Sequence, residues 1–324
     1  MNFFGPRARR VLDALTDYAS YRLLYSSVTN GLMALEGHEA DDGSNGELGV
    51  PSVEPVGDRA TIPKIIFQTW KSHFDIPANF RYWRRSFLVN NPDFRCFLWD
   101  DADNLRFIET RFPWFLARFQ SYSREIYRVD VVRLFFLYTY GGFYADMDSE
   151  CLKPLDSMRN MGDVLVGRMG GDSSFEHSIP NAIMASKSKQ AFWLLAIAFA
   201  VDRLQQSHER NDSRPEWLTG PVLLKDAVDF YMSHSQKEIS DYISKICPEL
   251  LPDIANSDFG TIKILPPSIW YPVNWNNFIQ TFFRNKMSRE KVVLDRAKAR
   301  RIFPRAFIVT YWSASWKSAS GERH

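Results

Sequence analysis

The chain has 324 residues, of which 45% are hydrophobic, so it is long enough for one large or two modest domains with a buried core. Its 40 Lys and Arg residues nearly balance its 38 Asp and Glu residues, which excludes the strongly basic surface expected of a nucleic-acid-binding protein. Its three cysteines are far apart and odd in number, which argues against both a disulfide framework and a zinc knuckle.

The first 60 residues are expected to lie outside the main domain. Residues 1–36 have helical spacing with several arginines near the start, which predicts an N-terminal helical appendage. Residues 37–60 are rich in Gly, Asp, Ser and Pro, which predicts a flexible linker. No run approaches the ~20 apolar residues of a membrane-spanning helix, and Asp13 and Asp17 interrupt the segment that a signal peptide would need. We therefore expect a cytoplasmic protein or one that is peripheral to a membrane.

Strand and helix patterns alternate from residue 61 onward. Apolar runs predict strands at 64–70 and 94–101, separated by a helix over 76–90, and helical spacing then fills 101–141. Further strands are predicted at 142–148, 163–168 and 181–186, with helices over 189–206 and 220–234 and late strands within 261–273 and 305–312. This alternation predicts an α/β sheet covered by helices.

Asp146 and Asp148 stand one residue apart in the stretch "YGGFYADMDSE". If the strand continues through them, their side chains point to the same face and Met147 points into the core. At the end of a strand in an α/β sheet they would face the crevice where such sheets bind ligands, and paired carboxylates suit Mn²⁺ or Mg²⁺. The alternative is an acidic turn in solvent, because a DxD triplet by itself is common.

Asp130 and Arg133 lie on one side of the helix that precedes the triplet. Their neighbours in sequence are mostly Val, Leu and Phe, and an unpaired charge in such surroundings is unfavourable. Two explanations stay open at this point. The two residues either form a buried structural ion pair or bind hydroxyl and phosphate oxygens of a ligand.

Six segments, in this order, carry a resemblance to a known family: "IPKIIFQTWK", "NNPDFRCFLWDD", "YRVDVVRLFFLYTYGGFYADMDSECLKPLD", "NAIMAS", "TGPVLL" and "YWSASWK". The chain resembles the sugar-binding DxD glycosyltransferases of family 32, which include inositol-phosphoceramide mannosyltransferases and are related to the clostridial glucosylating toxins. The resemblance covers residues 61–317 and leaves 318–324 as a tail. It implies a GT-A type, Rossmann-like nucleotide-sugar fold and a hexosyltransferase that retains the anomeric configuration.

The resemblance also implies how the donor is bound. Trp70 would stack on the base of the nucleotide, Asp130 and Arg133 would hold the donor sugar, and Tyr144 belongs to the same donor-binding block. The donor would be GDP-mannose or a UDP-hexose. The acceptor would be a hydroxyl of a glycan, a lipid or a small aglycone. The aromatic segment around Trp270 is compatible with an apolar acceptor or with contact to a membrane surface, although core packing is the favoured explanation for it.

The metal and the closing of the site are implied in the same way. Asp148 would coordinate the cation directly, and Asp146 would contact the ribose and a metal-bound water. Together with Asp130 and Arg133, Asp148 is predicted to carry catalysis. Ser315 and Trp316 would come from a C-terminal loop that closes over the diphosphate.

The chain also departs from the family pattern. Relatives often carry His where this chain has Phe67 and in the segment that here contains Tyr311, which puts a metal or phosphate contact near Tyr311 in doubt. Asn181 and the turn at Gly220 and Pro221 are further candidates for the acceptor or sugar side, and each could equally be structural. The alternative function is a non-catalytic nucleotide-sugar or carbohydrate-binding protein with the same fold.

Overall fold

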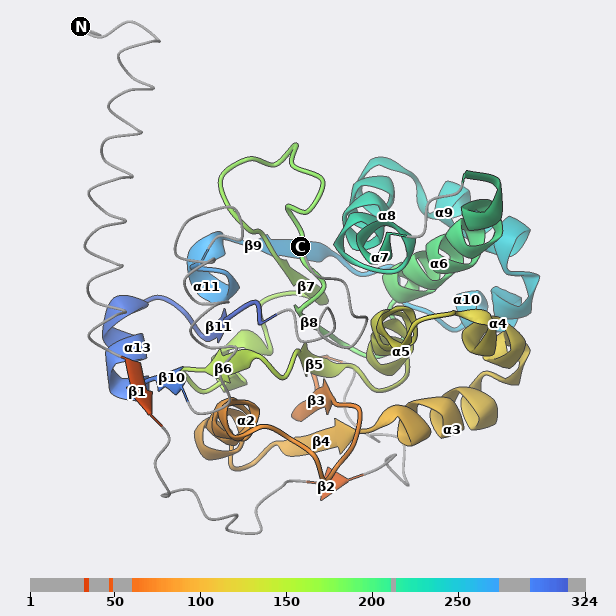
Figure 1. Ribbon diagram of the computed structural model, residues 1–324. Coiled ribbons are helices and arrows are strands. Elements are labelled where there is room, and N and C mark those ends of the chain that lie inside the picture. Colours follow the sequence, from red (N-terminus) through yellow and green to blue (C-terminus); the bar gives the residue numbers. More distant parts are fainter. Residues whose placement is uncertain (1–31, 35–46, 49–59, 211–213, 274–291, 314–324) are drawn as a thin grey trace, which may run out of the picture.

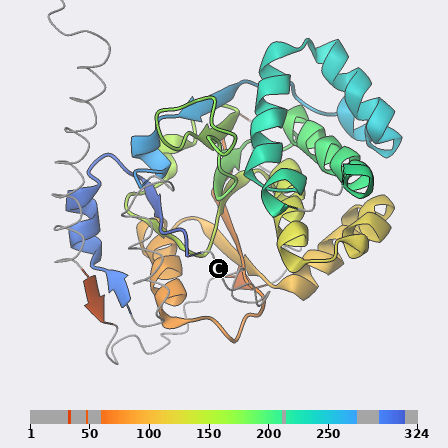
Figure 2. The same ribbon diagram turned by 45° about the horizontal axis from the view of Figure 1, so that its top comes forward.

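The computed structural model of the protein describes residues 32–34, 47–48, 60–210, 214–273 and 292–313. These residues form a central sheet with helices on both faces (Figure 1). In the tilted view, α5, α6 and α8 lie on one side of the sheet and α2 and α13 on the other (Figure 2). The predicted α/β class is confirmed.

The elements have the following bounds. The strands are β1 (Leu32–Ala34), β2 (Glu47–Leu48), β3 (Ile65–Thr69), β4 (Arg95–Trp99), β5 (Gly142–Ala145), β6 (Ser149–Cys151), β7 (Val164–Gly167), β8 (Ile183–Ser186), β9 (Ile262–Leu265), β10 (Val292–Leu294) and β11 (Ile308–Thr310). The helices are α2 (Ala78–Asn90), α3 (Asp101–Arg111), α4 (Leu116–Ser121), α5 (Glu125–Tyr140), α6 (Ala191–Arg210), α7 (Pro215–Leu218), α8 (Pro221–Ser233), α9 (Gln236–Ile246), α10 (Leu251–Ala255), α11 (Pro267–Trp270) and α13 (Arg296–Ile302). Short 3₁₀ helices occupy Pro113–Phe115, Asp156–Met158 and Pro248–Leu250.

Seven strands form the main sheet in the order β2-β4-β3-β5-β8-β7-β9. All neighbouring pairs are parallel except the two that involve β8, which runs antiparallel to both β5 and β7. The carboxyl ends of β3, β4 and β5 therefore meet the amino end of β8 at one edge of the sheet. Two small antiparallel pairs, β1 with β10 and β6 with β11, lie outside the main sheet.

The sheet separates two hydrophobic cores, and alternate strand residues supply them. Phe67 and Tyr144 point into the core formed with α5 and α6, whereas Ile66 and Phe143 point into the core formed with α2 and α13. Both faces of these strands are buried, which explains why their sequences are continuous apolar runs rather than alternating patterns.

Two differences from the sequence-based boundaries concern the N-terminal 60 residues. Leu32–Ala34, within the predicted helical appendage, forms strand β1 and pairs with β10. Glu47–Leu48, within the predicted linker, forms the edge strand β2 beside β4. In both cases the partner strand comes from far along the chain, so pairing decides the local conformation and helical spacing does not reveal it. Within the described residues, no helix combines the length and the hydropathy needed to cross a bilayer.

At the sheet edge opposite the carboxyl ends of β3, β4 and β5, a salt bridge and two hydrogen bonds join the ends of β7, β8 and β9. Asp163, just before β7, accepts from Lys187 Nζ at 2.8 Å and from the N–H and hydroxyl of Thr261 at 2.8 and 2.9 Å. Burial alone would raise the pKa of the Asp163 carboxyl, but these donors hold it below its usual value. All three cysteines are buried free thiols, which agrees with the argument from their spacing against a disulfide framework.

Candidate active site

A pair of glycines sets the connection from α5 to the site. Gly141 and Gly142 have φ values of +65° and +90°, in the left-handed region that side chains disfavour. A Cβ on Gly142 would lie 2.6 Å from the carbonyl oxygen of Ile65 on the neighbouring strand β3. The buried helix α5 can therefore turn directly into β5, which brings the residues after β5 back beside the side chains of α5.

Arg133 is the centre of the site. Its side chain is only 3% exposed, and its guanidinium lies 2.9 Å from Asp130 Oδ1 and 3.2 Å from Asp146 Oδ1. It also stands 4.4 Å above the ring of Tyr144, whose hydroxyl donates to the same Asp146 oxygen at 2.8 Å. Four of the predicted site residues therefore form one connected cluster. Asp130 and Arg133 therefore form a buried ion pair, and the contact of Arg133 with Asp146 links this pair to the DxD triplet.

Asn181 joins this cluster from the amino end of β8. Its side-chain amide donates to Asp130 Oδ1 at 2.9 Å, and its backbone carbonyl accepts from Arg133 at 2.8 Å. Thr219, next to the turn at Gly220, lies 3.4 Å from Asp130 Oδ2 through its hydroxyl. These three contacts, two from Asn181 and one from Thr219, hold the Asp130–Arg133 pair. Thr219 was not among the predicted site residues, although the neighbouring turn at Gly220 and Pro221 was.

Asp146 and Asp148 are arranged differently from the prediction. Strand β5 ends at Ala145, and residues 146–148 form a turn closed by a hydrogen bond of 3.0 Å from the N–H of Ser149 to the carbonyl of Asp146. The reasoning from a shared strand face is therefore wrong. Two expectations drawn from that reasoning are nevertheless met. Met147 is buried in the core, and Asp146 and Asp148 are both partly exposed.

Asp148 contacts the end of β11. The N–H and the hydroxyl of Ser313 both donate to Asp148 Oδ2, at 2.7 and 3.0 Å, and the hydroxyl of Thr310 lies 3.4 Å from Oδ1. The sequence did not single out Ser313 or Thr310. The only available signal was the quoted segment "YWSASWK", which contains Ser313 and directly follows Thr310.

Three carboxylates and one guanidinium share this region. Burial raises the pKa of Asp130 to about 6 even though Arg133 opposes the change. Burial and the charge of Asp146 raise the pKa of Asp148 to about 6, against the donors of Ser313. Burial also raises the pKa of Asp146. The ionised cluster has excess negative charge, which a divalent cation would balance.

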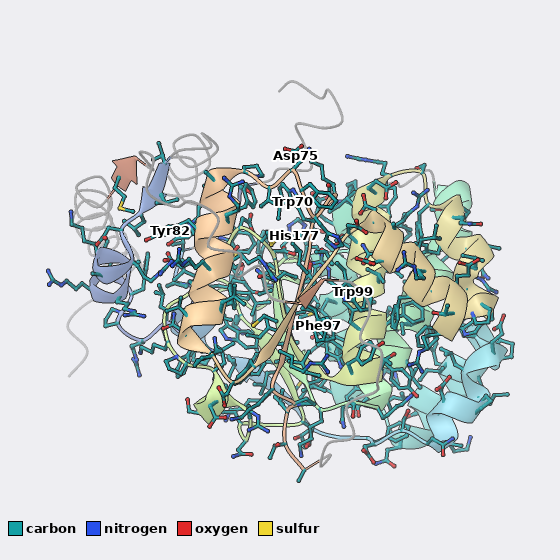
Figure 3. The ribbon with its side chains drawn as sticks, turned by 90° about the horizontal axis from the view of Figure 1, so that it is seen from below. Trp70, Asp75, Tyr82, Phe97, Trp99 and His177 are labelled. Atoms are coloured by element: carbon teal, nitrogen blue, oxygen red, sulfur yellow. The ribbon has the colours of Figure 1, made fainter. Side chains whose placement is uncertain are left out.

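Trp70 lies directly after β3 at the same sheet edge. Its ring packs on Phe80 with centroids 4.5 Å apart, and its indole N–H donates to the carbonyl of Asp75 at 2.8 Å (Figure 3). Its backbone N–H donates to the carbonyl of Trp99, which extends the pairing of β3 with β4. Ser315 and Trp316 lie outside the described residues, so their predicted role in closing the site stays a prediction.

The two positions that depart from the family pattern both belong to the core. Phe67 is fully buried and packs on Phe97, with ring centroids 5.6 Å apart. Tyr311 is fully buried as well, and its hydroxyl donates to the buried carboxylate of Glu150, which also pairs with Arg296 at 3.1 Å. The Tyr311 side chain is thus engaged away from the DxD turn, which agrees with the doubt about a metal contact at this position.

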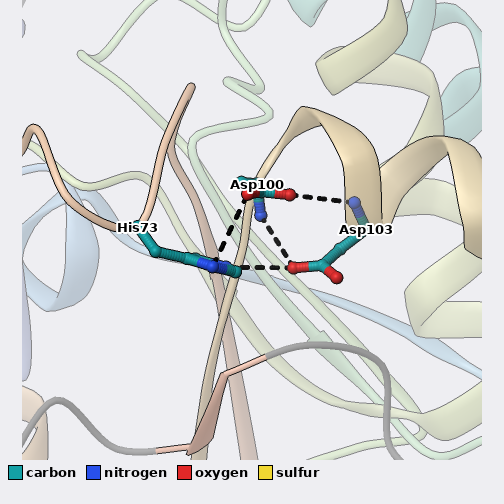
Figure 4. Close-up of side chains that lie close together, drawn as sticks. All are labelled: His73, Asp100 and Asp103. Carbon is teal, nitrogen blue, oxygen red and sulfur yellow. Dashed lines mark hydrogen bonds and ion pairs between the residues drawn. The ribbon is translucent and has the colours of Figure 1, made fainter.

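A second group of metal-ligating side chains lies at the start of α3 (Figure 4). His73 Nε2 is 3.0 Å from Asp103 Oδ2, and His73 Nδ1 is 3.5 Å from Asp100 Oδ2. Asp100 and Asp103 also form the capping box of α3. The two ring nitrogens face two different carboxylates, whereas a metal ion binds a histidine through one nitrogen. Hydrogen bonding and helix capping therefore account for this group, which ties the loop after Trp70 to α3.

Comparison with known proteins matches the part of the chain that contains Asp130, Arg133, Asp146 and Asp148 to a family model. Residues 77–164 match the model of the glycosyltransferase sugar-binding region containing a DXD motif. Inositol phosphoceramide mannosyltransferase 3 of Schizosaccharomyces pombe is 46% identical over 99 residues, which cover 31% of this chain and 28% of that protein. Mannosyl phosphorylinositol ceramide synthase SUR1 of Saccharomyces cerevisiae is 35% identical over 136 residues, covering 42% and 34%.

Two more distant similarities were found. The initiation-specific alpha-1,6-mannosyltransferase of Saccharomyces cerevisiae is 32% identical over 110 residues, covering 32% of this chain and 23% of that protein. Among solved structures, PaToxG glycosyltransferase matches with a TM-score of 0.41 and 16% identity, over 60% of this chain and 74% of that one. The matched part spans about a third of the length of the first curated relatives. The resemblance inferred from the sequence is confirmed, because residues 77–164 of this chain match the sugar-binding region of the DXD-containing glycosyltransferases and part of the chain is similar to curated mannosyltransferases.

Proposed function

We propose that this chain transfers a hexose from a nucleotide diphosphate sugar to a hydroxyl group of an acceptor, with a divalent cation and with retention of the anomeric configuration. One observation carries the proposal. Asp146 and Asp148 follow β5 at the carboxyl edge of the sheet, and the Asp146 carboxylate is tied to the buried pair of Asp130 and Arg133. Open α/β sheets bind ligands at this edge.

The donor atoms of the cluster suit Mn²⁺ or Mg²⁺. The available ligand atoms are carboxylate oxygens, which hard divalent cations prefer, and the cluster holds three carboxylates for one guanidinium. Asp148 and Asp146 would hold the cation. A bound cation would neutralise the charge that develops on the departing diphosphate.

Arg133 mainly organises the carboxylates around it. Its guanidinium contacts the carbonyls of Val129 and Asn181 and the carboxylates of Asp130 and Asp146. An arginine side chain has five N–H groups, so four contacts leave one N–H for an oxygen of the donor. The proposed role of Arg133 is therefore to fix Asp130 and Asp146 in place and to offer at most one direct hydrogen bond to the sugar or phosphate.

Mannose is the proposed sugar, and GDP-mannose is the proposed donor, with UDP-hexoses as the competing class. The support comes from the relatives, which are named as mannosyltransferases. The names of two of them include inositol phosphoceramide, which favours a lipid-linked acceptor hydroxyl. Trp70 would stack on the base, Tyr144 would support the donor through Asp146, and Ser315 and Trp316 would cover the diphosphate.

Thermal unfolding with and without nucleotides tests the donor site. GDP, UDP, GDP-mannose and UDP-glucose are each added with and without Mn²⁺, because a ligand that binds only the native state raises the midpoint of unfolding. We expect GDP and GDP-mannose to raise the midpoint only when Mn²⁺ is present. Stabilisation by UDP compounds alone would reject the guanine nucleotide, and stabilisation that does not need metal would reject the metal site.

Transfer itself is tested with GDP-mannose and a lipid acceptor that carries an inositol phosphate headgroup. Asp148→Asn should abolish both transfer and the metal effect while the circular dichroism spectrum stays that of the wild type. An Asp148→Asn variant with normal turnover would overturn the site assignment. The anomeric configuration of the product, determined by NMR, checks retention, and an inverted product would reject that part of the proposal.

A further inference from the structure

The Asp148 carboxylate is held by a segment that lies 165 residues further along the chain. Strand β11 pairs with β6, and the N–H of Tyr311 donates to the backbone carbonyl of Asp148 at 2.9 Å, which extends the pairing alongside the DxD turn. Ser313 follows two residues later and donates twice to Asp148 Oδ2. The end of β11 is therefore part of the wall of the proposed metal site.

Trp312 gives the chain the change of direction that this contact needs. Its φ is +53°, a conformation that is rare for bulky residues and is kept only where the surroundings enforce it. Its ring stacks on Tyr271, with centroids 5.6 Å apart, and its indole N–H donates to the carbonyl of Val273 at 3.2 Å. These contacts hold Trp312 in the left-handed conformation. The backbone N–H and the hydroxyl of Ser313 then both reach the same carboxylate oxygen.

The two aspartates of the triplet are held in the same way. Asp146 accepts from Tyr144 and Arg133 through Oδ1, and Asp148 accepts from Ser313 through Oδ2. Within the described residues, no donor contacts Asp146 Oδ2, and Asp148 Oδ1 has only the long contact with Thr310. Each carboxylate is thus anchored through one oxygen, and its other oxygen is left for a further ligand.

We propose that Ser313 is a positioning residue for metal binding. It fixes the Asp148 carboxylate through Oδ2, so that Oδ1 is presented to a divalent cation. The inference rests on the proposed function, because it concerns the cation that the DxD pair would bind. Hydrogen bonds to a ligating carboxylate orient it, and their loss typically weakens metal binding about 10- to 100-fold.

Binding of Mn²⁺ alone to the purified full chain tests this role without any substrate. Titration calorimetry, and the loss of the EPR signal of aqueous Mn²⁺, measure the affinity. Ser313→Ala removes the hydroxyl donor and should weaken Mn²⁺ binding about 10-fold. Ser313→Thr restores a hydroxyl and should recover most of the affinity.

Ser149→Ala is the matched control. Ser149 is also next to Asp148, but its buried hydroxyl has no hydrogen-bond partner among the described groups. The control should bind Mn²⁺ as the wild type does. Thermal unfolding without metal shows whether each variant is folded, and the midpoint of Ser313→Ala should stay close to that of the wild type. A purely structural role for Ser313 would change the midpoint and leave the Mn²⁺ affinity of the folded protein unchanged.

The outcomes separate this inference from the proposed function. If Asp148→Asn loses Mn²⁺ binding and Ser313→Ala binds as tightly as the wild type, or more tightly, the positioning role is wrong and the metal site stands. If Asp148→Asn binds Mn²⁺ as the wild type does, the metal site of the proposed function is wrong and the positioning role falls with it. Weakened binding by Ser313→Ala, recovered by Ser313→Thr, supports both.

Discussion

Arg133→Met probes whether the centre of the site also holds the fold together. Methionine keeps the aliphatic part of this side chain, which is only 3% exposed, and removes its guanidinium. The carboxylates of Asp130 and Asp146 would lose their common cationic partner, and the carbonyl of Asn181 would lose its donor. The removal of one partner from a buried ion pair costs about 3–5 kcal/mol.

A loss of this size is large for a domain whose total stability is about 5–15 kcal/mol. Urea unfolding, followed by tryptophan fluorescence at neutral pH, measures it. Lys237→Met is the control, because Lys237 pairs with Asp241 at 2.6 Å while both side chains are well exposed. Exposed pairs contribute little, so the control should unfold as the wild type does.

A second substitution tests whether the loss comes from unpaired charge. Asp130→Asn in the Arg133→Met background removes one of the orphaned carboxylates, and the double variant should be more stable than Arg133→Met alone. Residues of one network are not expected to behave additively. A loss below about 1 kcal/mol for Arg133→Met, or a double variant less stable than the single one, would refute this account of the buried cluster.

Three further predictions concern two single hydrogen bonds and the contacts of one carboxylate. Tyr311→Phe leaves buried Glu150 without its hydroxyl donor and should lower the free energy of unfolding by about 1–3 kcal/mol in urea, with unchanged Mn²⁺ affinity. Tyr144→Phe removes a donor to Asp146 and should weaken Mn²⁺ binding about 10-fold in calorimetry, without loss of the fold. Asp163 has a lowered pKa in the folded state, so it stabilises the fold above the unfolded-state pKa and loses this effect as the pH falls through the folded-state pKa. Asp163→Asn should therefore be less stable than the wild type at pH 7 in urea unfolding, and the difference in stability should shrink as the pH falls below the unfolded-state pKa of the carboxyl; a difference of unchanged size in acid would contradict this.

The parts of the fold that the sequence predicts well are those with strong local signals. β3 and β4 are apolar runs bounded by Pro63 and by the turn before Phe94, and they were predicted within two residues. The end of α5 is predicted correctly because a glycine pair marks it in the sequence. The structure needs glycine at 141 and 142, where φ is positive and a Cβ would contact neighbouring backbone. Asp130 and Arg133 were grouped correctly because an i,i+3 spacing on one helix needs no tertiary information.

The remaining members of the site depend on contacts that no local pattern encodes. Asn181 reaches Asp130 because β8 runs antiparallel to β5, which places the amino end of β8 at the same sheet edge as the carboxyl end of β5. A parallel strand with the same sequence would place Asn181 at the opposite edge. Thr219 and Ser313 likewise come from segments whose position is decided by packing.

The last described residues show how closely stability and the proposed site are connected. Tyr311 points into the core and bonds the buried Glu150, whereas Ser313, two residues later, bonds Asp148. Glu150 lies on β6, the strand that pairs with β11, and Asp148 lies two residues before it, in the turn that leads into β6. The pairing of β11 with β6 therefore places Tyr311, before Trp312, against the buried carboxylate of Glu150. It also places Ser313, after Trp312, against the carboxylate of Asp148 in the DxD turn. β11 and β6 are far apart in the sequence. The hydrogen bonds from Ser313 to the Asp148 carboxylate therefore form only when β11 has paired with β6.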